Sequence, residues 1–252
     1  MKIEQVAVSP CSNPEMGLDD VLSANASLGY KHFEVFTSWT NSAFDYHTCP
    51  QAYLKIGQQF SMVFTSFHLP PITADGLVLS LQEAITAVRF AEAMGVEIVL
   101  YKAHDRATYI NAAPAFLNAI EDLRVIPVIQ NHYGSALSTL DDMKKVFESI
   151  GDPRMRTLLE VGHFHSVGVD WRKAAEYLGD SVALVHIKDQ MGQQSVPFGQ
   201  GEIDLQALFQ TMDENGFEGR YVIEMEVSDK ENTLAYLADA HKYVLDYCEE
   251  GT

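Results

Sequence analysis

Four apolar runs in the second half of the chain end in side chains that bind metal ions and transfer protons. The stretch VIPVIQNHYG (125–134) ends its apolar part at Gln130, and the three later runs end at Glu160, His186 and Glu224. Oxygen ligands with a single imidazole suit Mn²⁺, Mg²⁺ or Co²⁺ better than a metal that prefers thiolates. The sequence therefore predicts a divalent metal site formed by Gln130, Glu160, His186 and Glu224, with Zn²⁺ as a further candidate.

Short apolar runs and helical patterns alternate along the chain and indicate how these residues are positioned. The expected strands cover residues 3–9, 32–36, 61–68, 96–103, 125–130, 156–161, 182–188 and 220–226. Clear helices are expected at 80–95, 139–151 and 204–216, and the last two begin at the N-cap residues Thr139 and Asp204. Eight βα units of about 31 residues favour an α/β fold with one closed (β/α)₈ TIM barrel over an open doubly wound sheet.

Such a barrel carries its active site at the carboxyl ends of its strands, so polar residues there are candidates by position. Residues two apart on a strand share a face, which pairs Gln130 with His132 and His186 with Lys188. The residues expected to contact substrate are Trp39, His68, His104, His132 and Asp189. Each of them alone is as readily a hydrogen-bonded or packing residue of the barrel mouth, and Glu34 could be a structural acceptor. The prediction of an active site rests on all of these strand-end residues taken together.

Composition narrows the classes of partner. Seventeen Lys and Arg against 35 Asp and Glu give a net charge of −18, which repels nucleic acid and anionic membranes. No run approaches the ~18 apolar residues of a membrane span, and MKIEQVAVSP lacks the apolar core of a signal peptide. Cys11, Cys49 and Cys248 have no CxxC spacing, so no disulfide framework is indicated. We expect one domain over residues 1–252, a cytoplasmic location and a small-molecule substrate.

The strand-end segments resemble those of the xylose-isomerase-like TIM barrels, which include sugar isomerases, ketose 3-epimerases, inosose dehydratase and DNA-repair endonucleases. The segments that carry the resemblance are IQNHYG, LLEVGH, VHIKD and GQGEIDLQALFQTMDENGFEGRYVIEMEV. It spans nearly the whole chain and implies that the family's Glu, Asp, His and Glu ligands fall on Gln130, Glu160, His186 and Glu224. It also implies that His163 binds substrate, and that the chain acts on a small sugar-like molecule, in a family whose barrels often form homodimers or homotetramers.

Two of those four positions depart from the family pattern. The amide of Gln130 cannot take up a proton at neutral pH, so one of the two opposed carboxylates used by the epimerases is missing. Two ligand carboxylates in place of three leave the metal centre neutral, which lowers metal affinity and raises Lewis acidity. Glu160 is one methylene longer than Asp. The catalytic residues we expect are Glu224 as the base, with His163 and Lys188 among the candidate acids.

Four functions are compatible with these residues. One carboxylate base suits a metal-dependent isomerase or epimerase of a small sugar, sugar acid or polyol-derived ketone, and it equally suits a lyase or dehydratase on a similar substrate. A phosphodiester-cleaving enzyme is disfavoured by the charge and because MGQQSVPFGQ lacks the Asp-x-His of the repair endonucleases. A metal-free barrel without activity is the fourth alternative.

Overall fold

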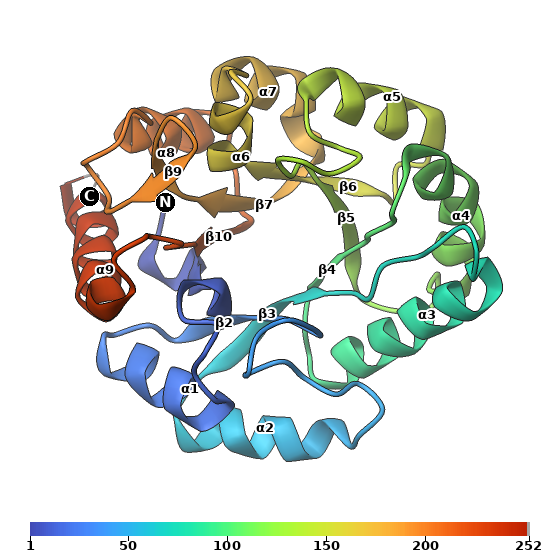
Figure 1. Cartoon of the computed structure of the whole chain (residues 1–252), viewed down its shortest axis with the longest axis horizontal. Helices are drawn as coiled ribbons and strands as arrows, with labels where there is room; N and C mark the ends of the chain where they lie inside the picture. The colour runs from blue at the N-terminus through green and yellow to red at the C-terminus, as the bar shows by residue number, and fades with distance from the viewer. Residues whose placement is uncertain (251–252) are drawn as a thin grey trace.

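Eight parallel strands close into a barrel with helices on its outside in the computed structural model, which describes residues 1–250 (Figure 1). The strands are β1 (Val6–Val8), β2 (His32–Val35), β3 (Val63–His68), β4 (Ile98–Leu100), β5 (Ile126–Gln130), β6 (Arg156–Glu160), β7 (Val182–Ile187) and β10 (Arg220–Ile223). Each strand pairs with the next, and β1 pairs with β10 to close the ring. The predicted closed α/β barrel is confirmed.

Helices follow the strands and form the outer layer seen in Figure 1. They are α1 (Leu18–Ser27), α2 (Pro50–Gln59), α3 (Leu77–Ala93), α4 (Arg106–Ala119), α5 (Leu140–Ile150), α6 (Val161–Ser166), α7 (Trp171–Leu178), α8 (Leu205–Glu214) and α9 (Thr233–Glu250). Thr139 caps α5 as predicted, because its side chain accepts a hydrogen bond from the Asp142 backbone. Asp204 caps α8 in the same way, through the Ala207 backbone. Within residues 1–250, no helix combines the length and apolar character needed to cross a bilayer.

Side chains along the strands alternate between two environments. One set forms a small apolar cluster in the barrel interior, made of Ala7, Ile98, Leu100, Val128, Leu158, Ala183, Leu184 and Val222. The other set, which includes Val99, Ile129 and Leu159, packs beneath the helices in a larger cluster. A residue two positions beyond an interior side chain therefore points into the barrel mouth.

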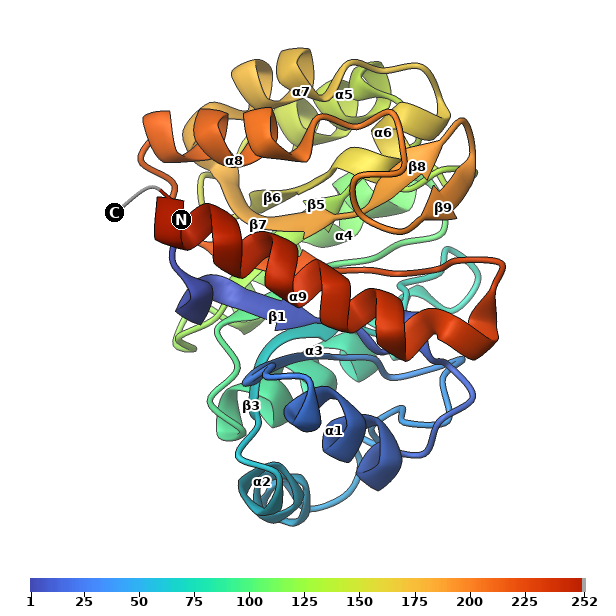
Figure 2. The ribbon, with the colours of Figure 1, turned by 90° about the vertical axis from the view of Figure 1, so that its left-hand side faces the viewer.

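Two further strands, β8 (Asp189–Met191) and β9 (Gln194–Val196), form an antiparallel hairpin after β7. Figure 2 shows this hairpin at the opposite end of the barrel from the N-terminus, so it lies beside the carboxyl ends of the strands. The sequence did not predict it. All eight barrel strands are shorter than expected, most of all β1, β4 and β10: residues 3–5 form a 3₁₀ turn, β4 covers three residues of the expected 96–103, and β10 ends at Ile223.

Candidate functional site

The carboxyl ends of three consecutive strands bring together three of the four predicted metal ligands. They are Glu160 at the end of β6, His186 on β7 and Glu224 directly after β10, and all three are buried. Each stands two positions after a residue of the interior cluster, so each continues an inward-facing row. Strand register adds to this, because Glu160 is the direct partner of His186.

His186 lies at the centre of the cluster and contacts carboxylates through both ring nitrogens. Nδ1 is 3.0 Å from Oε2 of Glu160 and 3.2 Å from Oε1 of Glu224. Nε2 is 3.1 Å from Oε1 of Glu34 on β2. Burial would lower the pKa of His186, but the charges of Glu34 and Glu224 outweigh it and raise the pKa well above its usual value. Without a cation, the imidazole therefore carries two protons and a positive charge.

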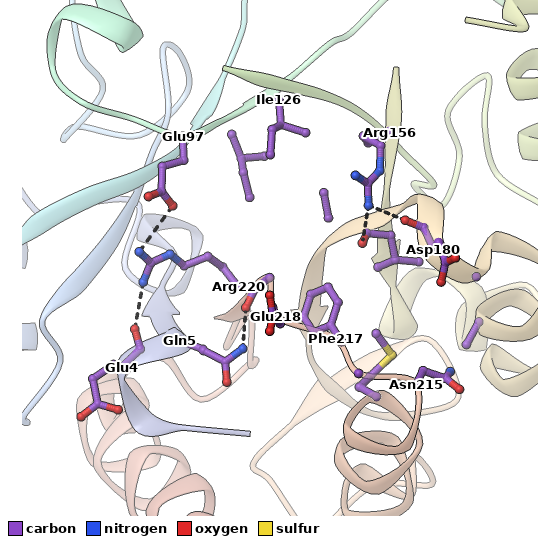
Figure 3. Close-up of a pocket in the computed structure, with 18 of the residues that line it drawn as sticks. Glu4, Gln5, Glu97, Ile126, Arg156, Asp180, Asn215, Phe217, Glu218 and Arg220 are labelled. Atoms are coloured by element: carbon purple, nitrogen blue, oxygen red, sulfur yellow. Dashed lines mark hydrogen bonds and ion pairs between the residues drawn. The ribbon is translucent and has the colours of Figure 1, made fainter. Parts of the chain in front are cut away.

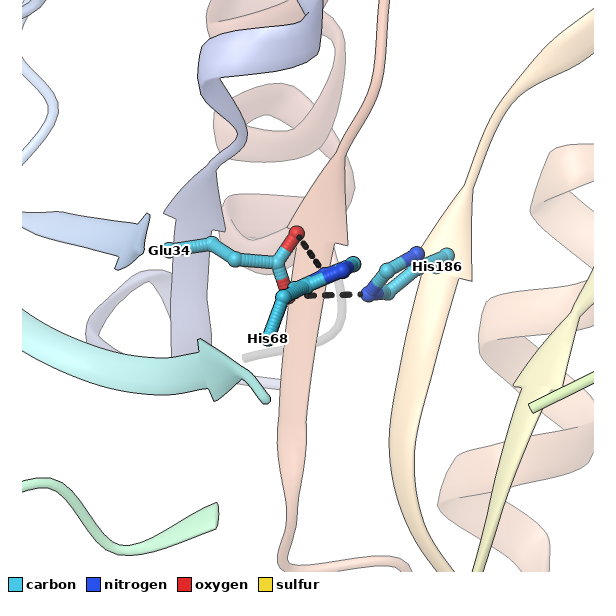
Figure 4. Close-up of side chains that lie close together, drawn as sticks. All are labelled: Glu34, His68 and His186. Carbon is cyan, nitrogen blue, oxygen red and sulfur yellow. Dashed lines mark hydrogen bonds and ion pairs between the residues drawn. The ribbon is translucent and has the colours of Figure 1, made fainter. Parts of the chain in front are cut away.

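Glu34 continues the cluster across the barrel (Figure 4). Its Oε2 is 3.2 Å from Nε2 of His68, and its Oε1 accepts a hydrogen bond of 2.9 Å from Ser66. Nδ1 of His68 in turn accepts from Nζ of Lys102 at 2.6 Å, which leaves the His68 proton on Nε2, facing Glu34. Burial, with the charge of Lys102, lowers the pKa of His68 to about 4, so its ring is neutral. Contacts thus run without a break from Lys102 on one side to His186 on the other.

Lys188 is fully buried beside the same cluster. Its Nζ is 2.8 Å from Oε2 of Glu224 and also pairs with the carboxylate of Glu226. Burial would lower the pKa of Lys188, but the charges of Glu224 and Glu160 raise it well above its usual value. Lys188 therefore keeps its proton near neutral pH. This suits a role in orienting Glu224 more than the role of proton donor that the sequence suggested.

The two carboxylates that face Nδ1 of His186 differ in their titration. Burial would raise the pKa of Glu224, but the charges of Lys188 and His186 hold it well below its usual range. Burial raises the pKa of Glu160 to about 6; the charge of Glu224 also raises it, and the charge of Lys188 lowers it. Glu224 is therefore ionised at neutral pH, as a general base must be.

The donor set fits a divalent cation. Glu160, His186 and Glu224 each offer one ligand atom within 4.8 Å of the others, and carboxylate with imidazole is a usual ligand combination for such ions. Nε2 of His186 would keep its proton and donate to Glu34, the usual second partner of a metal-bound histidine. Glu34, His68 and His186 form a second group of the same kind. It needs Nε2 of the same imidazole, so the two groups compete for one side chain.

Three more predicted residues lie around this cluster. Gln130 ends β5 and is nearly buried, and its side chain makes no hydrogen bond within residues 1–250, so its amide is available to a cation or a substrate. The rings of His132 and His163 lie against each other with centroids 3.9 Å apart. Burial, with the charge of Lys188, holds the pKa of His163 far below its usual value. Its neutral ring suits a hydrogen bond with a substrate hydroxyl.

Three predicted substrate contacts are not brought to the cluster. The carboxylate of Asp189 accepts hydrogen bonds from the backbone N–H groups of Gln190, Gly199, Gly201 and Ile203, at 2.9 to 3.3 Å. It therefore holds the segment that follows the β8–β9 hairpin, and its oxygens are occupied. His104 is exposed in the loop after β4. Trp39 is 60% exposed and packs beside Phe36, so it lies on the rim.

Asn131 supports the site without being singled out by the strand-end pattern. Its buried side chain donates to the backbone oxygen of Glu160 at 2.9 Å and accepts from the Glu160 backbone N–H at 3.0 Å. The amide thus takes the place of a backbone partner and ties the end of β5 to the end of β6. The sequence signal that could have identified Asn131 is an Asn directly after Gln130, expected on the opposite and buried face of the strand.

A cavity of about 1080 Å³ opens at the other end of the barrel, at the amino ends of the strands (Figure 3). Two of its arginines are engaged by the chain itself: Arg220 contacts Glu97 and the Glu4 backbone oxygen, and Arg156 donates to backbone oxygens that include that of Ser181. Figure 3 shows these contacts around the cavity wall. They tie together the amino ends of the strands, and among the described residues the groups that could hold a metal ion lie at the mouth instead.

The chain is similar to known proteins over most of its length. A family model described as xylose isomerase-like TIM barrel matches residues 22–246. The chain is 25% identical over 138 residues to an inosose dehydratase of Clostridium perfringens, covering 46% of each chain. It is 28% identical over 97 residues to the L-ribulose-5-phosphate 3-epimerase UlaE of Salmonella paratyphi A, covering 38% of this chain and 34% of that protein. The matches thus span less than half the length of these two curated relatives.

Among solved structures, the IolI protein with a bound zinc atom superimposes with a TM-score of 0.80 at 15% sequence identity, covering 98% of both chains. At this identity the likeness establishes the fold alone. The His and Glu cluster at the barrel mouth remains the chain's own evidence that it can hold a metal ion.

Proposed function

Since the chain belongs to the xylose isomerase-like TIM barrel family, we propose that it is a divalent-metal-dependent isomerase or epimerase of a small sugar, sugar acid or polyol-derived ketone. The observation that carries the proposal is the ionised, buried Glu224 beside two further donors that fit a cation, His186 and Glu160. A curated relative is a sugar-phosphate epimerase, which supports a sugar-like substrate.

The chain's residues divide the work as follows. Glu160, His186 and Glu224 would hold the ion, with the amide of Gln130 as a fourth ligand. A bound divalent ion would polarise the substrate carbonyl and stabilise negative charge that develops on its oxygen. Glu224 removes the proton from the carbon next to that carbonyl. Lys188, held against Glu224 at 2.8 Å, keeps the base ionised and oriented.

Gln130 restricts the chemistry to one face of the substrate. An amide neither removes nor returns a proton at neutral pH, so a second base opposite Glu224 is missing. A single base returns the proton on the face from which it came, which suits the transfer of a proton between neighbouring carbons in an aldose–ketose isomerisation. The neutral His163 would bind a substrate hydroxyl near this base.

Solvent exchange tests the proposal directly. The chain, loaded with Mn²⁺ and incubated in D₂O with a panel of ketoses, aldoses and keto acids, should introduce deuterium at the carbon next to the carbonyl. Glu224→Gln should reduce the exchange rate by about 10²- to 10⁴-fold, the usual contribution of a positioned base. Glu226→Gln is the matched control, because Glu226 contacts the same lysine but is 41% exposed. No exchange with any member of the panel would overturn the proposal.

A dehydratase acting on a similar polyol is the second candidate. It is favoured by the missing second base at Gln130 and by the similarity to an inosose dehydratase. Here Glu224 removes the same proton and passes it to the hydroxyl on the neighbouring carbon, which leaves as water. Mass spectrometry distinguishes the two reactions, because elimination yields an unsaturated or 2-keto-3-deoxy product that lacks one water, whereas isomerisation leaves the mass unchanged.

A further inference from the structure

Lys102 is a cation of the barrel mouth that lacks an anionic partner. It follows β4, and its Nζ contacts Nδ1 of the neutral His68 at 2.6 Å. No carboxylate lies within ion-pair distance of Nζ in the part of the chain that the structure describes. The other lysine of the mouth, Lys188, contacts two carboxylates. The two lysines are thus in opposite electrostatic situations.

The position of Lys102 is fixed by neutral groups. His68 accepts one of its three N–H donors, and the ring of Phe36 lies 5.9 Å from Nζ. Two N–H donors therefore remain for another acceptor. The side chain is half-buried, so an incoming molecule can reach it, while burial lowers its pKa to about 8. Leaving a charge in this environment without an anion costs free energy, which an anionic ligand would recover.

With an ion bound, the charge of the site would not repel an anionic ligand. Around the cluster stand four carboxylates, those of Glu34, Glu160, Glu224 and Glu226. Two lysines and a bound divalent ion would balance them, provided that His186 gives up its Nδ1 proton to the ion. In a chain of net charge −18, this mouth would be locally neutral, and Lys102 would be its lysine without a carboxylate in direct contact.

We propose that the substrate carries an oxyanion group, a carboxylate or a phosphate, and that Lys102 binds this group at the β3–β4 side of the barrel mouth. The inference rests on the proposed function and specifies its substrate class. Lys102 determines specificity and takes no part in the proton transfer, because the base stands on the opposite side of His186 from the His68 and Lys102 pair.

Binding of matched pairs tests the inference. The Mn²⁺-loaded chain of 252 residues is titrated calorimetrically at low salt with D-gluconate and D-sorbitol, and separately with D-ribulose 5-phosphate and D-ribulose. In one pair the charged member should bind about 10- to 100-fold more tightly, the usual effect of one charge-assisted contact. The pair that shows the preference identifies the group as a carboxylate or a phosphate. Lys102→Met should remove the preference and leave the affinity for the neutral member unchanged.

Two further variants isolate the local contact. Lys102→Arg keeps a cation and should retain the preference. Lys145→Met removes a lysine from the exposed face of α5, so it changes the net charge equally and should have no effect. Equal affinities for charged and neutral members in the unmodified chain, or an equal loss of both in Lys102→Met, would overturn the inference. Because binding and deuterium exchange are measured separately, a preference together with absent exchange would reject only the proposed function.

Discussion

Replacing Glu34 by Gln is expected to weaken metal binding about 10- to 100-fold, although Glu34 is not expected to be a ligand. Oε1 of Glu34 accepts from Nε2 of His186 at 3.1 Å, and Oε2 lies 3.2 Å from Nε2 of His68, which also carries a proton. A carboxylate presents an acceptor oxygen to each of them. An amide has one oxygen, so in either orientation its NH₂ group must face one of the two N–H groups.

The size of the effect follows from this mismatch. The variant loses one charge-assisted hydrogen bond and keeps two donors facing each other, a change worth about 1.5 to 3 kcal/mol. That range corresponds to about 10- to 100-fold in affinity. The loss is transmitted through His186, whose ring orientation and remaining proton depend on Glu34.

Calorimetric titration with Mn²⁺ measures this directly on the unmodified chain, on Glu34→Gln and on Ser66→Ala. The Ser66 variant is the control, since it removes only the hydroxyl that donates to Oε1 of Glu34 at 2.9 Å and should change the affinity severalfold at most. Unchanged affinity in Glu34→Gln would refute the reasoning. Two ions bound by the unmodified chain and one by the variant would instead show that Glu34 is itself a ligand.

Three further predictions concern the charge of the site and its supporting loop. Gln130→Glu should bind Mn²⁺ more tightly, and the deuterium exchange assay measures whether its catalytic rate falls. If neither the Mn²⁺ affinity nor the exchange rate changes, Gln130 is not a metal ligand. The apparent Mn²⁺ affinity should fall about tenfold per pH unit as the pH drops, because the raised pKa of His186 makes the ion compete with a proton. The fall should be steeper below pH 6, where Glu160 also takes up a proton. In the metal-free chain, the folding stability contributed by His186 depends on pH in the opposite sense: it is complete below the unfolded pKa of His186 and is lost as the pH rises through the raised folded pKa. Gly201→Ala should destabilise the chain by about 2 to 4 kcal/mol in urea unfolding, because a Cβ there would lie 2.0 Å from Oδ1 of Asp189. Gly192→Ala is the control: its Cβ would meet no atom within 4 Å, and its positive φ should lower the stability by about 1 kcal/mol.

Hydrophobic patterning was sufficient to predict the barrel and the inward direction of its strand ends. Eight apolar runs separated by helical periodicity leave few alternatives to a closed parallel barrel, and the period of two along a strand orients His186 once Leu184 is interior. The β8–β9 hairpin was missed because its strands are three residues long and polar, so burial imposes no alternation on them. Its register depends on Gly192 and on the contacts of Asp189, which sequence periodicity does not report.

The site was predictable where it depends on one strand and unpredictable where it depends on a neighbour across the barrel. Glu160 and His186 follow from strand position, and so does their proximity, because β6 and β7 are adjacent. The contact of His186 with Glu34 joins residues 152 positions apart. The barrel diameter and the strand stagger determine which carboxylate contacts which imidazole nitrogen, and neither quantity can be predicted from local sequence.

Glu34 also gives a physical reason for the amide at position 130. Three carboxylates already contact the single imidazole of His186, those of Glu34, Glu160 and Glu224, and each of them is buried. A fourth carboxylate at the end of β5 would add negative charge to a cluster whose nearest compensating cations are Lys188 and a bound ion. Burial, together with the charge of Glu224, already raises the pKa of Glu160 to about 6, and a further carboxylate nearby would raise it more. On this argument the amide of Gln130 keeps Glu160 ionised while no ion is bound; a carboxylate there would bind an ion more tightly but would raise the pKa of Glu160 in the metal-free chain.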